Sequence, residues 1–485
     1  MRVTKLSDPS RQVRNLLLTA FLVCGLCACT SLPPEDYQAR LQADYTPENW
    51  LYASQFEPIT QQFERDIFAQ IHSEELRDLI RQALQNNLDL RSNRLSVLAS
   101  ALASRQVDGQ LLPELQLQSQ AGRDKQLYDG EPSFRNEYGI GLLLEWELDL
   151  WGRIRHQRLA QRAELEALQI DYRGARQSVI GLVTRTYLGL WQLDALQQLE
   201  ARRLEIFTNL QQITEEQYLS GLTNQQDWLL AALKVRETQA RLRALQEQHQ
   251  ATGMQLSLLL GEKPGQLSFS ASLPDVSIPL VSVPATVLAN RPDVQAAFQR
   301  LQAKHYEKTA MYRALLPDIS LSANTARQTD RLSRLSGAET VWALVGVISQ
   351  SLMLANIIDA GPLSLARAGS LQEQAERQRY LQVVLDAIVD VENFLLRERS
   401  LTEQQQYLKQ AVELADGLYI DYQQRYQSGL VSLLDLLNIQ EQSLAATEAL
   451  LDNQFEQVNN RILLGLALGM GGPEPDMPVV VGKAL

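Results

Sequence analysis

Residues 142–155 read LLLEWELDLWGRIR, and the fold is decided by the change of pattern inside this stretch. As far as Leu150, an apolar side chain occupies every second position, which is typical of a β-strand with one apolar and one polar face. The residues that alternate with them include three acids, Glu145, Glu147 and Asp149. From Gly152 onward the apolar residues follow helical spacing instead. The stretch therefore predicts a two-faced strand that runs directly into a long helix.

Composition and charge limit the class of protein. With 485 residues, of which 45% are hydrophobic, the chain is long enough for two or three ordinary domains or for one elongated architecture. The formal net charge of −12 and the absence of basic runs argue against a nucleic-acid partner, because affinity for phosphate comes largely from clustered Lys and Arg. All three cysteines lie in the first thirty residues, so the rest of the chain cannot contain a disulfide framework.

Residues 1–28 are predicted to be an export signal. Basic residues precede an apolar run at 16–26, which is too short to span a bilayer as a mature helix. The signal ends in LCAC, which resembles the lipobox of bacterial lipoproteins and predicts a covalent lipid on its last residue, Cys29. Thr30 follows instead of Asp, which by the same resemblance favours the outer membrane. A redox or metal-binding Cys-x-x-Cys site is the alternative, but an apolar segment disfavours thiolates.

The rest of the chain is predicted to be a tandem duplication. The sequence LPEL at 112–115 returns as LPDI at 316–319, and NLDL at 87–90 returns as RPDV at 291–294; both pairs lie 204 residues apart. Further along, QYLSGL at 217–222 returns as RYQSGL at 425–430, which is 208 residues later. Each repeat is expected to contain a helix, two strands separated by a polar loop, and two long helices that meet at the Ser-Gly-Leu turn.

The predicted boundaries follow the two repeats. The helices span 75–112, 152–219 and 223–260 in the first repeat and 293–315, 362–427 and 431–469 in the second. The strands span about 113–121, 138–150, 317–325 and 341–354. The repeats are assigned to 75–261 and 287–470, separated by a Pro/Ser-rich linker at 262–286 whose prolines forbid a continuous helix. The remaining divisions are a lipidated N-terminal segment, 29–74, and a C-terminal tail, 471–485.

Heptad spacing supports the long helices. In the second repeat the seam visits Leu434, Leu437, Glu441, Leu444, Glu448, Leu451, Phe455, Val458, Ile462 and Gly465, which includes two acids. In the first repeat the expected seam is Leu199, Ile206, Leu210 and Ile213. The periodicity alone would also fit an ordinary antiparallel bundle.

Each predicted strand would separate apolar from polar side chains. The expected outward, apolar set is Leu115, Leu117, Ile140, Leu142, Leu144, Trp146, Leu148, Ile319, Leu321, Trp342, Leu344 and Ile348. The expected inward, polar set is Gln116, Gln118, Glu145, Glu147, Asp149, Ser349 and Ser351. Residues 341–358 carry no charge and could instead form a transmembrane helix. The polar residues within this segment and the three acids of its repeat partner disfavour that alternative.

Four strands cannot close a membrane barrel. An open sheet edge in lipid leaves backbone groups unsatisfied at several kcal/mol each, and known membrane barrels begin at about eight strands. If these strands cross a membrane, several copies of the chain must therefore share one barrel.

The order of elements, the duplication, the lipobox and the segment EWELDLWGR at 145–153 resemble the outer-membrane factor family of TolC-like efflux channels, and within it the lipoprotein branch of resistance-nodulation-division (RND) systems. The resemblance implies a membrane α/β fold, in which a homotrimer pools four strands per protomer into a twelve-stranded outer-membrane β-barrel. A long periplasmic α-helical barrel would continue it. The implied function is a passive exit duct for small molecules, coupled to a periplasmic adaptor and an inner-membrane RND-type pump. The outer membrane would hold the chain through both the barrel and the lipid.

The resemblance also assigns candidate sites. The expected adaptor contacts are the two turns, with Ser220, Gly221, Leu222, Ser428, Gly429 and Leu430. The candidate gate residues are Asp421, Arg425, Asp435 and Asp227, although solvated charges at a helix end would look the same. From the strand pattern itself, Glu145, Glu147 and Asp149 are expected to line the lumen and to favour cations. The segment 354–362 departs from the family's usual turn, so the second strand-to-helix transition is open by a few residues.

Nothing in the sequence indicates catalysis. The four histidines, His72, His156, His249 and His305, lack metal-ligand spacing, and no Walker-type Gly-Lys-Ser/Thr motif is present. The sequence therefore predicts no enzyme activity, no metal and no cofactor other than the lipid on Cys29. The alternative function is a periplasmic coiled-coil scaffold lipoprotein without channel activity. Within the channel class, the sequence does not separate export of drugs, metals or proteins.

Overall fold

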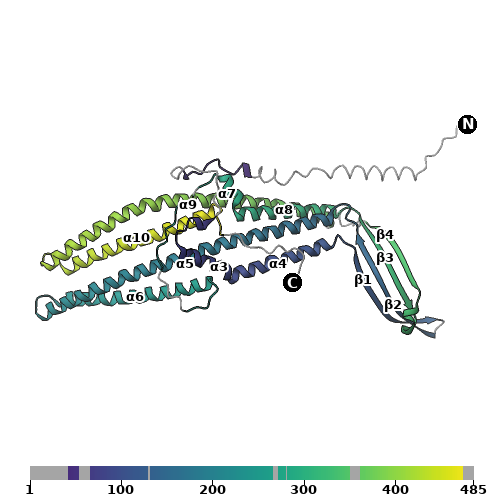
Figure 1. Cartoon of the computed structure of the whole chain (residues 1–485), viewed down its shortest axis with the longest axis horizontal. Coiled ribbons are helices and arrows are strands. Elements are labelled where there is room, and N and C mark those ends of the chain that lie inside the picture. The colour runs from purple at the N-terminus through teal and green to yellow at the C-terminus, as the bar shows by residue number, and fades with distance from the viewer. Residues whose placement is uncertain are drawn as a thin grey trace. The chain divides into compact units, whose positions relative to one another are not determined.

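The computed structural model describes residues 42–53, 66–128, 131–265, 271–279, 281–349 and 361–472. Residues 47–485 form one structural unit, which contains a sheet of four strands and two hairpins of long helices (Figure 1). The predicted export signal, Cys29 and the end of the fourth predicted strand at 350–354 lie outside the described residues.

The four strands form one antiparallel sheet in chain order. They are β1 (Glu114–Tyr128), β2 (Glu131–Glu147), β3 (Asp318–Thr329) and β4 (Thr340–Ser349). Each repeat contributes one hairpin, and β2 pairs with β3 where the hairpins meet. Among the described residues β1 and β4 are edge strands, so the sheet as described has two unpaired edges.

One prediction about the strands is wrong. Residues 122–137 were expected to include a loop, but β1 and β2 stay paired from Gly122–Glu137 to Tyr128–Glu131. This ribbon lacks apolar alternation, and alternation is the signal that predicts a strand. The transmembrane-helix alternative fails for 341–349, because these residues belong to β4. In the described part of the chain, no helix combines the length and apolar character that crossing a membrane requires.

The register places the predicted outward residues of the strands on one face. Leu117 pairs with Leu142, Leu142 with Thr325, and Thr325 with Trp342. Apart from Leu143, the opposite face is formed by polar or small residues on β1 to β3, with Gln116 and Ser322 among its members, but β4 differs. Val341, Ala343, Val345 and Val347 occupy that face of β4, so β4 is apolar on both sides. Leu148 lies beyond the end of β2.

The first repeat has four helices. They are α3 (Glu74–Asn86), α4 (Leu88–Gly109), α5 (Arg153–Leu219) and α6 (Gln225–Leu259). The single helix predicted at 75–112 is therefore wrong, because it breaks at Asn87. This residue has φ −55° and ψ 126°, outside the helical region, and its Oδ1 accepts a hydrogen bond from the backbone N of Leu90 at 3.1 Å. Asn is a favoured N-cap residue.

The second repeat follows the same plan. Its helices are α7 (Pro284–Asn290), α8 (Pro292–Arg313), α9 (Pro362–Gln427) and α10 (Leu433–Ala467). The prediction of 362–427 agrees with α9, whereas α7 was missed because its residues were divided between the linker and the second repeat. Pro284 begins α7 at the position where its missing N–H has no helical partner in any case.

The helices pack in a fixed order. Next to the sheet, α4 packs on α5, α5 on α8 and α8 on α9; farther away, α6 packs on α5, α5 on α10 and α10 on α9. The seam predicted for α5 is partly wrong, since Ile206 and Ile213 are exposed in the single chain. The buried positions of this part of α5 are Glu200, Arg203, Phe207, Leu210 and Thr214.

Candidate functional site

The junction between β2 and α5 is built around Asp149. Its Oδ1 accepts a hydrogen bond from the backbone N of Ile154 at 3.0 Å, and its Oδ2 accepts one from the backbone N of Arg155 at 2.9 Å. Burial raises the pKa of Asp149, but these bonds and the Arg155 guanidinium lower it by more, so the pKa lies below 3.8. Only 7% of the side chain is exposed. Asp149 therefore satisfies the first N–H groups of α5 and is not the lumen-lining acid that the sequence predicts.

The other two predicted lumen acids lie on the polar face of β2. Glu145 is exposed and stands opposite Glu114 of β1, so two like charges face each other across the strands. Glu147 forms an ion pair with Arg153, with 2.5 Å between Oε1 and Nη2. The negative charge of this face is therefore strongest at Glu114 and Glu145. The sequence analysis missed Glu114. This acid could have been identified because it begins the first of the two-faced strands.

The second repeat reaches into the same junction through Arg313. Its Nη1 donates to the backbone O of Trp151 at 2.7 Å, while Trp151 Nε1 donates to the backbone O of Pro317 at 2.7 Å. A side chain at Gly152 would collide with the Arg313 guanidinium. Burial lowers the pKa of the adjacent His156 below 6.5, and the charge of Arg313 lowers it further. The Trp-Gly-Arg motif thus connects the two repeats where sheet and helices meet.

The two Ser-Gly-Leu turns have the predicted geometry. Gly221 and Gly429 have φ of 72° and 71°, in the left-handed region that favours glycine. In each turn the backbone N of the leucine donates back to the helix, from Leu222 to Gln217 O at 2.8 Å and from Leu430 to Arg425 O at 2.9 Å. The leucine side chains are 79% and 74% exposed. Each turn therefore presents a large apolar side chain at the end of a hairpin.

Two of the predicted gate residues form an ion pair. The Asp421 carboxylate lies 2.9 Å from Arg425 Nε, one helical turn away on α9 and close to the second Ser-Gly-Leu turn. Both side chains are about half exposed.

The other two predicted gate residues lie at equivalent helix starts. Asp435 Oδ2 accepts from the backbone N and the Oγ of Ser432, at 3.1 and 2.6 Å, and these bonds lower the pKa of Asp435 below 3.8. Asp227 Oδ2 accepts from Thr223 Oγ1 at 2.8 Å. The structure thus brings Asp421 and Arg425 together, whereas Asp227 and Asp435 each bond within their own turn.

A charged network that sequence reasoning missed links the two helical hairpins. Its acids and bases are Glu200 and Arg203 of α5, Lys234 and Arg241 of α6, and Glu441 and Glu448 of α10. Glu200 is 1% exposed and lies 3.2 Å from Arg203 Nη1 and 3.1 Å from Arg241 Nε. Arg203 also pairs with Glu441. The sequence did contain an indication of this network, because Glu441 and Glu448 are the two acids of the predicted α10 seam.

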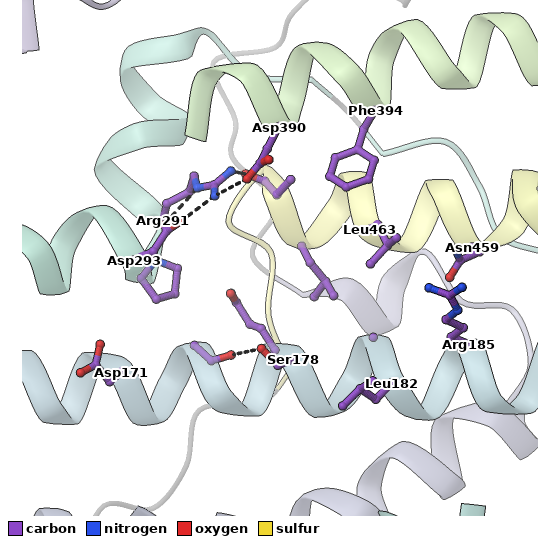
Figure 2. Close-up of a pocket in the computed structure, with 16 residues that line it drawn as sticks. Asp171, Ser178, Leu182, Arg185, Arg291, Asp293, Asp390, Phe394, Asn459 and Leu463 are labelled. Atoms are coloured by element: carbon purple, nitrogen blue, oxygen red, sulfur yellow. Dashed lines mark hydrogen bonds and ion pairs between the residues drawn. The ribbon is translucent and has the colours of Figure 1, made fainter. Parts of the chain in front are cut away.

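A cavity of about 680 Å³ lies where α8 begins and α10 ends (Figure 2). Arg291 lines it, although this side chain is 9% exposed. Its Nη2 lies 2.6 Å from Asp293 Oδ2 and 3.2 Å from Asp390 Oδ2. Burial lowers the pKa of Arg291, but these two carboxylates raise it by more. On the opposite wall, α5 contributes Asp171, Ser178, Leu182 and Arg185.

Among the residues that the structure describes, no three His, Cys, Asp or Glu side chains are grouped so that they could hold a metal ion.

A two-faced sheet with two open edges, continued by long helical hairpins from a duplicated sequence, defines the class of TolC-like outer-membrane channels. The chain belongs to the outer membrane efflux protein family, whose model matches residues 79–262 and 283–470. The family is one of channels, and its two matched segments correspond to the two repeats.

Similar proteins are outer-membrane components of efflux pumps. The solvent efflux pump outer membrane protein SrpC of Pseudomonas putida is 29% identical over 480 residues, which cover 94% of this chain and 98% of SrpC. The cation efflux system protein CusC of Escherichia coli O6:H1 is 27% identical, over 82% of this chain and 86% of CusC. The solved structure of the outer-membrane channel OprN has a TM-score of 0.78 and 25% identity, and covers 88% of this chain and 98% of that one.

Proposed function

We propose that this chain is the outer-membrane exit duct of a tripartite efflux system and that it works as a homotrimer. The proposal rests on the two open edges of the protomer's sheet. In the part of the chain that the structure describes, β1 and β4 have no strand partner on their outer sides. A sheet with an apolar face and two open edges can enter lipid only if other copies complete it.

The helices beside the sheet support the same closure. α4 and α9 stand at the two ends of the packing order, and both expose apolar side chains. On α4 these are Leu88, Leu95 and Leu102, spaced seven residues apart and 62%, 65% and 49% exposed. On α9 they include Leu371 and Val389, at 66% and 54%. Contact between α4 of one copy and α9 of the next would cover both stripes, and three copies would give a twelve-stranded barrel.

Small molecules are the proposed substrates. Among the similar proteins, SrpC is named as a solvent efflux component and CusC as a cation efflux component. In this chain, Glu114 and Glu145 would form a negative ring on the lumen face of the assembled barrel. Such a ring favours cations over anions without selecting one compound. Glu147 contributes less to it because of its ion pair with Arg153.

The hairpin ends are the proposed docking and gating region. Exposed Leu222 and Leu430 would contact a periplasmic adaptor, which couples the duct to an inner-membrane pump of the RND type. The Asp421–Arg425 pair lies one to two turns from the second hairpin end and would help to hold the entrance closed. Replacing Asp421 by Asn and Arg425 by Gln is expected to raise leak conductance. An unchanged leak conductance would mean that the gate lies elsewhere.

A lipid on Cys29 would be a second membrane anchor. Two hydrogen bonds fix the N-terminal segment to the second repeat region. Trp50 Nε1 donates to the backbone O of Ser282, just before α7, at 2.7 Å, and the backbone N of Leu51 donates to Glu392 of α9 at 2.6 Å. Glu392 lies about 45 Å along α9 from the helix start at Pro362. About twenty residues separate Cys29 from Trp50 and span at most about 70 Å. The tether is therefore long enough for the lipid to reach the membrane while Trp50 stays docked.

Conductance of the purified chain tests the proposal. The full chain, extracted from outer membrane in detergent, is expected to migrate as a heat-sensitive trimer and to conduct ions in planar bilayers. Cys29→Ala should keep conductance, because the barrel is a stronger anchor than acyl chains. A monomeric, non-conducting chain would overturn the proposal and favour the scaffold lipoprotein.

A further inference from the structure

The hairpin of β1 and β2 extends beyond the four-stranded sheet. The last cross-strand pair between β2 and β3 joins Tyr138 to Thr329, but β1 and β2 remain paired over 122–128 and 131–137. In Figure 1 this two-stranded ribbon projects past the ends of β3 and β4. The proposed duct assigns no role to the side chains of this ribbon.

The two faces of the ribbon differ in charge. Continuing from the apolar pair Leu117–Leu142, every second position of β1 leads to Arg123, Lys125 and Leu127. Their partners across the ribbon are Asn136, Phe134 and Pro132. The opposite face carries Asp124, Arg135 and Glu137. The face continuous with the apolar side of the sheet therefore has two cations, whereas the described acids of the ribbon lie on the other side.

Contacts confirm that the two cations share one site. The Arg123 guanidinium carbon lies 4.7 Å from the centroid of the Phe134 ring, and Lys125 Nζ lies 5.9 Å from it. Phe134 is 55% exposed. Among the side chains that the structure describes, none forms an ion pair with Arg123 or Lys125. The aromatic ring holds the guanidinium in place without neutralising it.

The height of this site in a membrane follows from strand geometry. Arg123 and Lys125 lie eight and ten residues along β1 from Leu115, the first apolar outward residue. At about 3.3 Å per residue and a tilt of about 40°, they stand about 20 and 25 Å above Leu115 along the membrane normal. The apolar band of an outer-membrane barrel is about 25 Å tall. Both cations would thus sit where acyl chains give way to headgroups.

We propose that Arg123, Lys125 and Phe134 form a binding surface for the phosphate groups of an outer-leaflet glycolipid. The inference rests on the proposed function, since it requires β1 to face lipid. Arg binds phosphate oxygens with two parallel N–H donors, and Lys adds a point charge beside it. The acyl chains of the same lipid would lie along Leu117 and Ile140, directly below. The surface holds the ribbon against the membrane rather than over the barrel mouth.

The test measures binding of bisphosphorylated lipid A to the full chain in mixed dodecyl-maltoside micelles, by retention of radiolabelled lipid on size-exclusion chromatography. Removing both cations, in Arg123→Gln with Lys125→Gln, is expected to weaken binding about 30-fold. The matched control, Arg135→Gln, removes one cation from the opposite face of the same ribbon and should change binding less than about twofold. Lipid A without phosphates should bind the unaltered chain as weakly as bisphosphorylated lipid binds the double variant.

Four results would overturn the proposal. The first three are equal binding by the double variant, an equal loss in the Arg135 control, and equal binding of the lipid that lacks phosphates. Full displacement by millimolar inorganic phosphate would also overturn it, since the site would then be a general anion site. Conductance of the same preparations separates the two proposals. A conducting chain with unchanged lipid binding contradicts only the lipid surface, whereas a non-conducting oligomer contradicts the duct.

Discussion

Each repeat contains a joint at which one helix ends and another begins, and the two joints are held together in different ways. In the first repeat, α6 ends at Leu259 and is followed closely by Gly261, which has φ of 70° and lies against Asn86. A side chain at Gly261 would collide with the backbone oxygen of Asn86. The next residue, Asn87, starts α4, and its Nδ2 donates to Leu259 O at 3.0 Å. A close backbone contact and one amide side chain make this joint.

The second joint uses the equivalent positions with different chemistry. Here α10 ends at Ala467 and is followed closely by Gly469. A side chain added at Gly469 would lie 3.3 Å from Asn290, so the backbones are less tightly packed than in the first joint. Arg291 takes the place of Asn87, and its Nη1 donates to Ala467 O and to Ala387 O of α9, both at 3.2 Å. The side chain also binds two carboxylates, those of Asp293 and Asp390.

The difference shows which part of the joint the duplication fixes. In both repeats a left-handed glycine follows the end of one helix and the cap of the next helix donates to the last carbonyl. What differs is the source of cohesion, which is backbone packing in the first repeat and a buried guanidinium in the second. The second joint also ties α9 to the junction, whereas Asn87 is too short to reach past its own helix pair.

The largest effect is expected from Arg291→Met. The substitution keeps most of the volume but leaves the carbonyls of Ala387 and Ala467 without this donor, so the free energy of unfolding should fall by about 3 kcal/mol. Guanidinium unfolding in detergent, followed by helical circular dichroism at a fixed protein concentration, measures it. Arg291→Lys should lower the free energy of unfolding by less than Arg291→Met does. A fall of less than about 1 kcal/mol for the Met variant would show that the guanidinium is not the main source of cohesion.

Next in size is Gly261→Ala. The added carbon meets the Asn86 carbonyl and also forces a left-handed Ala, so a loss of about 2–3 kcal/mol is expected. Gly469→Ala is the matched control, with about 1–2 kcal/mol from the backbone conformation alone. The same unfolding measurement applies. If Gly469→Ala were the more damaging change, the first joint would not be the tighter one.

Asn87→Ala removes both the cap of α4 and the hydrogen bond to Leu259. It is expected to lower the free energy of unfolding by about 1 kcal/mol. Asn87→Asp separates the two roles, because it still accepts from Leu90 but can no longer donate to Leu259. Hydrogen exchange of the first turn of α4 reports the cap, and exchange in the last turn of α6 reports the bond. Equal protection in both turns of the Asp variant and the unaltered chain would rule out a role for the donor.

The smallest effect concerns pH and compares the helix pairs near the sheet. In the second repeat Glu373 of α9 binds His305 and Lys308 of α8, at 2.7 and 2.6 Å. Burial raises the pKa of Glu373, but the bonds to these two residues lower it by more, to below 4.5. A carboxylate with a lowered pKa stabilises fully above its ordinary value of 4.5, and this contribution disappears as pH falls through the lowered value.

Glu373→Gln should therefore reduce stability at pH 7 and approach the unaltered chain as pH drops below 4.5. Thermal midpoints between pH 3 and 7 measure the convergence. In the first repeat Asp108 binds Arg158 and Arg162 in the corresponding helix pair, at 3.5 and 3.2 Å, and Asp108→Asn provides the comparison. A constant difference between Glu373→Gln and the unaltered chain across this range would contradict the expected linkage.

Much of the fold could be predicted because period and repetition are local signals. Alternation placed the apolar set of β1 to β4 on one face, and the Ser-Gly-Leu copies located both hairpin turns. The ribbon at 122–137 was missed because its apolar residues are few and do not alternate with its polar ones. The break at Asn87 was missed because neither Gly nor Pro marks it, although Pro292 does so in the other repeat.

The candidate site was harder to predict, because its side chains act across elements. Asp149 continues the alternation of β2, yet it folds back to cap α5. Glu114 and Glu145 become neighbours only through strand register. Glu441 and Glu448 looked like exceptions in a seam, but they pair with cations on α5 and α6, of which Arg203 is buried and Arg241 is 46% exposed. In each case spacing gave the position of the residue and only the fold gave its partner.

The two joints affect the circumference of the helical region. Only α5 and α9 run its full length, with 67 and 66 residues. Where α6 stops, α4 begins, and where α10 stops, α8 begins, so one short helix replaces another beside the same long neighbour. A ring of such subunits would keep one circumference from top to bottom. At each joint, where one short helix follows another, the wall could twist without becoming wider.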